Sequence, residues 1–149
     1  MAGIAVEDDR DRRRHRRSIV AAVVAGVRDK VRTFALTLPE AAEEHPWGED
    51  VVKVRGKIFV FLGSTASRSM TVKLEESHAH ALSIDGAEPT GYGLGKSGWV
   101  TVPLRAAGVN VALLRDWVEE SYRIVAPKRL VAELDGDGLE NRVDLSRGR

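Results

Sequence analysis

Basic residues placed close to aromatic ones are the part of this 149-residue sequence with the clearest chemistry. Lys53, Arg55 and Lys57 fall within five residues, and Lys96 lies three positions before Trp99. Basic side chains bind phosphate oxygens and an exposed indole ring can stack on a base, so the pattern indicates a surface for nucleic acid or another anion. The candidate DNA- or ligand-binding residues are Lys53, Arg55, Lys57, Lys73, Lys96, Trp99, Lys128 and Arg129.

The remaining reactive residue types do not form a catalytic set. The chain has no cysteine, which excludes disulfides, thiolate nucleophiles and cysteine-based metal sites. Residues 90–97 end like a phosphate-binding loop, but Thr90 stands where that loop needs its first glycine, and a predicted strand follows instead of a helix. No nucleophile–base pair remains, so we expect no catalytic residue and no enzymatic activity.

The histidines and the clustered acidic residues do not predict a metal site either. His78 and His80 are two positions apart and would point to different faces of a helix. His45 has no clear carboxylate partner in the sequence, and the acidic residues around Trp47 are interpreted as a solvated rim. These are Glu43, Glu44, Glu49 and Asp50. We therefore expect neither a metal ion nor a cofactor.

The first three cations belong to a predicted β-hairpin within residues 38–63. In residues 52–55 valines alternate with basic residues, which is the period-two pattern of a strand with one wet face. Gly56 supplies the turn, and residues 57–62 return almost wholly apolar, as expected for a strand buried on both sides. The hairpin should therefore carry a cationic tip on a rigid apolar ribbon.

The rest of the pattern places this hairpin in an α+β fold. The other predicted elements are a helix over 18–37, a strand over 70–74, a short helix over 75–84, an irregular Gly-rich loop over 85–98, a strand over 99–103, a helix capped by Asn110 and ended by Pro127, and a short helix over 128–134. This order predicts a single compact domain, with an antiparallel sheet of about four to five strands packed by a long N-terminal helix and C-terminal helices.

Both ends of the chain fall outside this domain, which we place at residues 18–134. Residues 1–17 hold six arginines against four acidic residues and show no apolar period, so we expect a disordered Arg-rich arm with a charge of +2. The rest of the chain then holds 17 basic and 18 acidic residues, a net charge of −1. Residues 135–149 are rich in glycine and charge and should form a flexible tail.

The apolar run 19–27 behind the arginines has some features of a signal peptide. Its helical period continues through the charged residues 28–30, however, and no small-residue cleavage pattern closes it. The run is also too short to cross a membrane. We therefore interpret it as part of the first helix and expect a cytoplasmic protein with no membrane partner.

Five separated blocks of the sequence together resemble one family. They are LPEAAEEHPWG, VRGKIFVFLG, MTVKL, GKSGWVTVPL and EESYRIVAPKRLVAELD, and in this order and spacing they are similar to the MmcQ/YjbR family of small bacterial proteins. The resemblance covers about residues 29–135 and implies a CyaY-like α+β fold and DNA binding through a double-wing motif. The family pattern falls on Trp47, Gly48, Gly56, Lys57, Phe59, Lys73, Lys96, Trp99, Tyr122, Pro127, Lys128 and Arg129.

Three functions fit these observations. The leading hypothesis is a monomeric module that binds DNA non-specifically and without chemistry, through the basic hairpin and the basic Gly-rich loop, with the arm 1–17 adding a salt-sensitive term. The alternative is a small-molecule or anion-binding domain, with Lys73, Lys96, Trp99 and Tyr122 lining a site under the Gly-rich loop. A third hypothesis is a protein-interaction adaptor that uses Trp47 and the hairpin edge.

Overall fold

One antiparallel sheet, covered on one face by two helices, forms the framework of the chain. The computed structural model describes residues 2–136, with side chains from residue 9 onward. The sheet has the order β1-β2-β3-β4-β6-β5. Its strands are β1 (Ala41–Glu44), β2 (Asp50–Val54), β3 (Lys57–Gly63), β4 (Ser69–Lys73), β5 (Glu88–Pro89) and β6 (Trp99–Pro103). The helices are α1 (Ala2–Leu36), α2 (His78–Ser83) and α3 (Val111–Val125), with short 3-10 turns η1 (Pro46–Gly48) and η2 (Leu94–Ser97).

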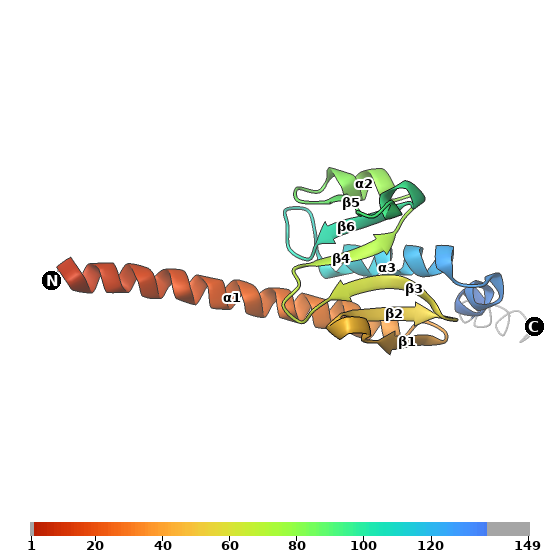
Figure 1. The fold of residues 1–149 in the computed structure, drawn as a ribbon, viewed down its shortest axis with the longest axis horizontal. Coiled ribbons are helices and arrows are strands. Elements are labelled where there is room, and N and C mark those ends of the chain that lie inside the picture. Colours follow the sequence, from red (N-terminus) through yellow and green to blue (C-terminus); the bar gives the residue numbers. More distant parts are fainter. Residues whose placement is uncertain (1, 137–149) are drawn as a thin grey trace, which may run out of the picture.

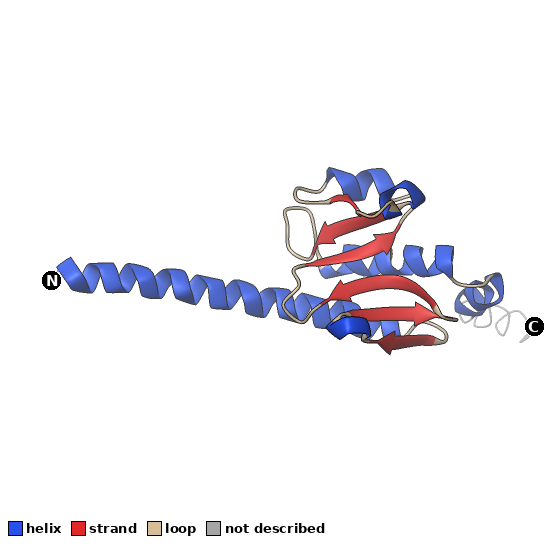
Figure 2. Cartoon of the chain, in the orientation of Figure 1, coloured by secondary structure: helices blue, strands red, loops and turns tan. Residues whose placement is uncertain are grey.

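The alternation of side chains along the strands decides which face is covered. In β4 and β6 every second residue is buried, with Met70, Val72, Val100 and Val102 almost inaccessible. These side chains belong to one hydrophobic core with residues of α3 and of the C-terminal half of α1, which lie behind the sheet (Figure 1). The intervening residues of the central strands lie on the other face, which no helix covers in the view of Figure 2. Any ligand surface on the strands must therefore lie on this open face or at the strand ends.

The predicted hairpin is present and its turn is tight. Only two residues, Arg55 and Gly56, connect β2 to β3, and both have positive φ, at 51° and 78°. Two successive left-handed residues match the right-handed twist of the flanking strands, and glycine adopts this conformation at little cost. The turn therefore holds Arg55 and Lys57 in fixed positions at one end of the sheet.

Helix α3 begins and ends where the sequence predicts. The Asn110 side chain accepts a hydrogen bond from the amide of Leu113 at 2.8 Å, which caps the first turn. The helix stops before Pro127, whose ring and missing N–H do not allow it to continue. Residues 128–136 are again helical, which confirms the short C-terminal helix.

Helix α1 differs from the prediction because it begins at Ala2 and not near residue 18. The expected disordered arm over 1–17 is helical from residue 2 onward. Alanine and arginine have high helix propensity, no glycine or proline interrupts residues 4–25, and Asp9 pairs with Arg13 one turn later at 2.7 Å. The expected flexible tail over 135–149 lies almost wholly outside the described residues.

The α+β architecture with one antiparallel sheet is confirmed, with six strands where about four to five were expected. The sequence pattern missed β1 and the two-residue β5. Alanine and glutamate in β1 are poor strand formers, so that strand depends on its pairing with β2. None of the helices within the described residues is both long and apolar enough to cross a membrane.

Candidate functional site

The sheet brings the eight predicted binding residues to the same end of the molecule. Lys53, Arg55 and Lys57 surround the β2–β3 turn. At that same end, Lys73 on β4 lies directly opposite Trp99 on β6. Lys96 precedes β6 in η2, and Lys128 and Arg129 follow α3.

Within this end the residues form two groups. The first group surrounds a shallow hollow of about 490 Å³ whose lining includes Arg55, Lys57, Arg123 and Lys128. The second group contains Lys73, Lys96 and Trp99. Gly98 belongs with it, because a Cβ atom at Gly98 would lie 3.7 Å from the Lys73 stem and only 2.8 Å from the Leu74 carbonyl oxygen. The glycine therefore lets the Gly-rich loop lie directly against β4 beside Lys73.

Some of these basic residues form ion pairs with carboxylates, and the others, which we call available, do not. Lys53 pairs with Glu44 at 3.1 Å, while Arg55 at 2.6 Å and Arg129 at 3.3 Å share Glu40. The hydrogen bond from Arg55 lowers the pKa of Glu40, which keeps this carboxylate charged and engaged. Within residues 9–136, no carboxylate pairs with the four remaining lysines of the set. These are Lys57, Lys73, Lys96 and Lys128.

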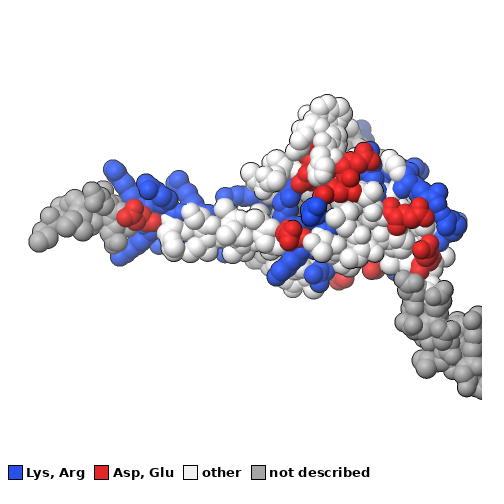
Figure 3. Space-filling view, turned by 90° about the horizontal axis from the view of Figure 1, so that it is seen from below, with Lys and Arg blue, Asp and Glu red and all other residues white. Residues whose placement is uncertain are grey.

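Acidic residues limit the cationic surface on the helical side. The groove between α3 and the segment after β4 has a volume of about 500 Å³, and five of its lining residues are acidic. They are Glu75, Glu76, Asp116, Glu119 and Glu120. Figure 3 likewise shows basic and acidic side chains interspersed over the domain. An anion would therefore approach Lys73 from the open face of the sheet, away from this groove.

A separate hollow of about 310 Å³ lies on the open face, under the Gly-rich loop. Its lining includes Phe61 and Thr71 from the sheet and Thr90, Tyr92 and Leu94 from the loop. The residues expected there do not line it. Lys73, Lys96 and Trp99 are absent from its wall.

Tyr122 is buried on the helix-covered side, where its ring packs edge-on against Phe59. Its hydroxyl donates to the Pro39 carbonyl at 2.7 Å. Tyr122 is thus separated from the group of Lys73, Lys96 and Trp99, and none of these four residues lines the hollow under the loop.

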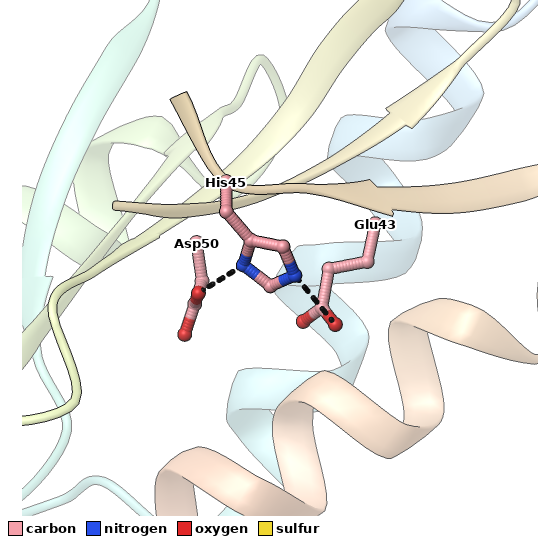
Figure 4. Close-up of side chains that lie close together, drawn as sticks. All are labelled: Glu43, His45 and Asp50. Atoms are coloured by element: carbon pink, nitrogen blue, oxygen red, sulfur yellow. Dashed lines mark hydrogen bonds and ion pairs between the residues drawn. The ribbon is translucent and has the colours of Figure 1, made fainter. Parts of the chain in front are cut away.

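The cluster that the sequence analysis missed centres on His45. Figure 4 shows its ring between two carboxylates, Asp50 next to Nδ1 at 2.5 Å and Glu43 next to Nε2 at 3.5 Å. Each carboxylate is also held by an arginine of α1, Asp50 by Arg28 and Glu43 by Arg32. The expectation that His45 lacks a carboxylate partner and that these acids form a solvated rim was therefore wrong for Glu43 and Asp50, whose side chains are only 13% and 14% exposed.

The geometry of this cluster favours an ion-pair network over a metal site. One potential ligand atom from each of Glu43, His45 and Asp50 lies within 4.8 Å of the others. The two ring nitrogens of His45 point to different carboxylates, however, so one metal ion cannot bind both ring nitrogens. Hydrogen bonds from Arg32 and Arg28 lower the pKa values of Glu43 and Asp50, respectively. The negative charge that would attract a metal ion is therefore already compensated.

The same network closes the base of a strained turn. Trp47 in η1 has a φ of 53° and an exposed fraction of 98%. A bulky residue in the left-handed region is uncommon and is kept there by its surroundings. The contact of His45 with Asp50 joins the two ends of the β1–β2 connection around Trp47. Glu43, His45 and Asp50 are close in the sequence, but no local signal could identify Arg28 and Arg32 as their partners, because these arginines lie on a different element.

Comparison with known proteins identifies the domain. Residues 36–124 match the sequence model of the YjbR family. These residues run from the end of α1 to the last turn of α3, and so include the whole sheet. The chain matches none of the curated proteins with which it was compared.

Proposed function

The chain belongs to the YjbR family, and we propose that its folded domain binds DNA without catalysing a reaction. The proposed contacts are the available cations at the end of the sheet that carries the β2–β3 turn. The resemblance to the family implies DNA binding, and the proposal assigns the contacts to a specific set of residues. Binding is expected to be insensitive to base sequence, because lysines on the phosphate backbone carry no sequence information.

The observation that supports this proposal is the presence, at one end of the fold, of four lysines that have no carboxylate partner among residues 9–136. Lys57 and Lys128 line the same hollow. Lys73 is the last residue of β4, and Lys96 lies in η2, just before the paired strand β6. Every other predicted cation of this end is engaged by Glu40 or Glu44. The phosphate contacts are therefore assigned to these lysines, and the paired residues are assigned a positioning role.

Trp99 adds an apolar contact to this surface. It is partly exposed at the start of β6, and its ring meets Phe61 edge-on with 5.4 Å between centroids. The edge contact fixes the orientation of the indole on the open face, next to Lys73 in the sheet register. An unpaired base next to phosphates held by the lysines would thus stack on a ring that is already positioned, whereas a base within a duplex would not.

The direct test is fluorescence anisotropy of a labelled DNA duplex over a salt series. The variants are Lys57→Gln/Lys128→Gln and Lys73→Gln/Lys96→Gln, and the control is Lys53→Gln, whose lysine pairs with Glu44. Each lost phosphate contact should reduce the slope of log affinity against log salt by about 0.9. We expect a reduction near 2 for each double variant and almost none for the control. Unchanged slopes in both double variants would refute the proposal.

The hollow under the Gly-rich loop supports a second candidate function, the binding of a small ligand. Its wall combines the ring of Phe61 with threonine and serine hydroxyls and a single carboxylate, Glu49. This composition favours an uncharged or cationic planar ligand over an anion. A thermal-shift screen with such compounds tests it, with Thr71→Val as the variant expected to abolish any stabilisation. A screen in which no compound raises the melting temperature would count against this function.

A further inference from the structure

The arginines of the projecting part of α1 form a second charged surface, distant from the lysines described above. The helix extends well beyond the sheet, with its N-terminus far from the domain (Figure 1). The side chains of residues 9–19 are all exposed. Six arginines and two aspartates occupy residues 9–17, a net charge of +4. Figure 3 shows these basic side chains gathered on the outer part of the helix, followed by a stretch with little charge.

The spacing of these residues shows which of the arginines face the domain. Arg13, Arg17, Val20 and Val24 follow one another at intervals of four, three and four residues, which places them in one row along the helix. Val24 is buried in the core and Val20 is partly buried, so this row is the one that enters the domain. Arg13 and Arg17 therefore extend the buried side of α1 outward, past the edge of the sheet. Arg13 pairs with Asp9 at 2.7 Å, but both side chains are more than half exposed, so this pair is weak and a phosphate can displace it.

Two further arginines meet this row where the helix leaves the domain. Val20 and Val24 line a hollow of about 360 Å³ together with Arg68, Pro103 and Arg105. Arg68 lies in the β3–β4 loop and Arg105 follows β6, and the Leu104 amide donates to the Arg68 carbonyl at 2.8 Å, which ties the two loops together. Both arginines are exposed, and neither has a carboxylate partner within residues 9–136.

We propose that Arg13, Arg17, Arg68 and Arg105 form a clamp for the phosphate backbone of duplex DNA, in the corner between the projecting helix and the sheet. This proposal rests on the proposed function for its partner but uses a different surface. The register of β4 and β6 places Arg68 and Arg105 at the end of the sheet opposite Lys73 and Trp99. The two surfaces can therefore fail or succeed independently.

The composition of the helix selects a polyanion over other partners. An amphipathic helix that binds lipid needs large apolar side chains on one face, and residues 9–18 contain none. Repulsion between closely spaced arginines opposes helix formation in a segment that has no tertiary packing. A regular array of phosphates neutralises these charges and removes the repulsion. Residues 9–17 would span roughly 13 Å at the rise of an α-helix, enough to follow several phosphates of one strand.

The test compares two pairs of charge removals on the same helix in the full chain. Arg13→Gln/Arg17→Gln alters the row that faces the clamp. Arg12→Gln/Arg14→Gln removes the same charge from rows that continue into the exposed Ile19 and Val23 and the exposed Ala21 and Ala25. A third variant, Arg68→Gln/Arg105→Gln, alters the domain side of the clamp. Each is titrated against a labelled duplex between roughly 50 and 200 mM salt.

We expect the first and third variants each to reduce the log–log salt slope by about 2 and to weaken binding at least tenfold, while the Arg12/Arg14 variant changes the slope by less than half as much. Equal effects of the two helix variants, or no effect of Arg68→Gln/Arg105→Gln, would overturn the clamp. Stronger binding to phosphatidylserine vesicles than to DNA would also overturn it, in favour of a membrane surface.

The lysine variants keep this result separate from the proposed function. Loss of binding in the lysine variants with unchanged arginine variants refutes the clamp and leaves the proposed function intact. The reverse pattern supports the clamp and refutes the assignment of phosphate contacts to the opposite end of the sheet.

Discussion

Replacing Asp50 by alanine should destabilise the fold strongly, because it leaves a nearly buried arginine without its counter-charge. The Arg28 side chain is 9% exposed and that of Asp50 is 14% exposed. Arg28 also donates to the Gly63 carbonyl at 3.0 Å and to the Leu62 carbonyl at 3.3 Å, so it joins α1 to β2 and β3 at once. Bulk water cannot replace the lost carboxylate at such a site.

The size of the effect follows from this burial. Breaking a buried pair by removing one partner costs about 3–5 kcal/mol, and because Arg28 keeps two carbonyl acceptors, Asp50→Ala should lie at the low end, about 3 kcal/mol. With a typical urea m-value for a small protein, the denaturation midpoint should fall by about 1–3 M. The matched control is Glu44→Ala, which breaks a pair whose glutamate is 54% exposed and should cost less than about 1 kcal/mol.

The pH dependence gives the same experiment a second readout. The hydrogen bond from Arg28 lowers the pKa of Asp50 in the folded state. A lowered folded-state pKa contributes stability that is present above the ordinary carboxyl pKa, about 3.9, and is lost as the pH falls through the folded value. Between about pH 5 and pH 2 the wild type should therefore lose more stability than Asp50→Ala.

A double-mutant cycle with Arg28→Met decides the interpretation. If the pair interacts as described, the double variant should be more stable than the sum of the single effects predicts, by at least about 1 kcal/mol. Additive effects, or an Asp50→Ala cost no larger than that of Glu44→Ala, would refute the reasoning from burial.

Four further substitutions test the packing, each by urea denaturation. Ser121→Ala should cost about 2–3 kcal/mol, because its buried hydroxyl donates to a β3 carbonyl at 2.5 Å and accepts from a β4 amide at 2.9 Å; a cost under half a kilocalorie would contradict that role. Tyr122→Phe should cost about 1 kcal/mol through its lost 2.7 Å bond, and full stability would contradict it. Gly98→Ala should cost more than Gly48→Ala, since both have positive φ but only Gly98 meets backbone, and the reverse order would count against this contact. Trp47→Ala should change stability by less than about 0.5 kcal/mol, given its exposure.

The sequence predicted those helices and strands whose local residue pattern is by itself enough to indicate the structure they form. Strand β6 occupies the predicted residues 99–103, and α3 begins directly after its predicted cap, Asn110. Alternating valines, a capping asparagine and a helix-ending proline act locally, so their signals survive without knowledge of the rest of the chain. The sequence did not predict strand β1, because its residues form a strand only through their pairing with β2.

The basic residues of the candidate site can be listed from the sequence, but their ion pairs cannot. The sequence predicted a cationic hairpin tip and a basic Gly-rich loop, and the pairing of β3, β4 and β6 is what brings the two to the same end of the sheet. Which of them are neutralised depends on Glu40 and Glu44, whose contacts are set by a strand that the sequence did not reveal. The His45 network depends on α1 passing within reach of the β1–β2 connection. Contacts of this kind between distant elements leave no periodic signal.

The His45 network also connects the stability of the fold to the clamp proposed on α1. Arg28 and Arg32 bind Asp50 and Glu43 within the part of α1 that packs on the sheet, about two to three turns after Val20, and so fix the direction of the helix and of its projecting half. Net charge alone predicts that Asp50→Ala, which removes an acidic residue, strengthens DNA binding. A clamp that depends on a fixed helix direction predicts weaker binding with an unchanged salt slope, since no phosphate contact is deleted. The sign of this change, measured under conditions in which the variant remains folded, therefore distinguishes a positioned clamp from a merely basic tail.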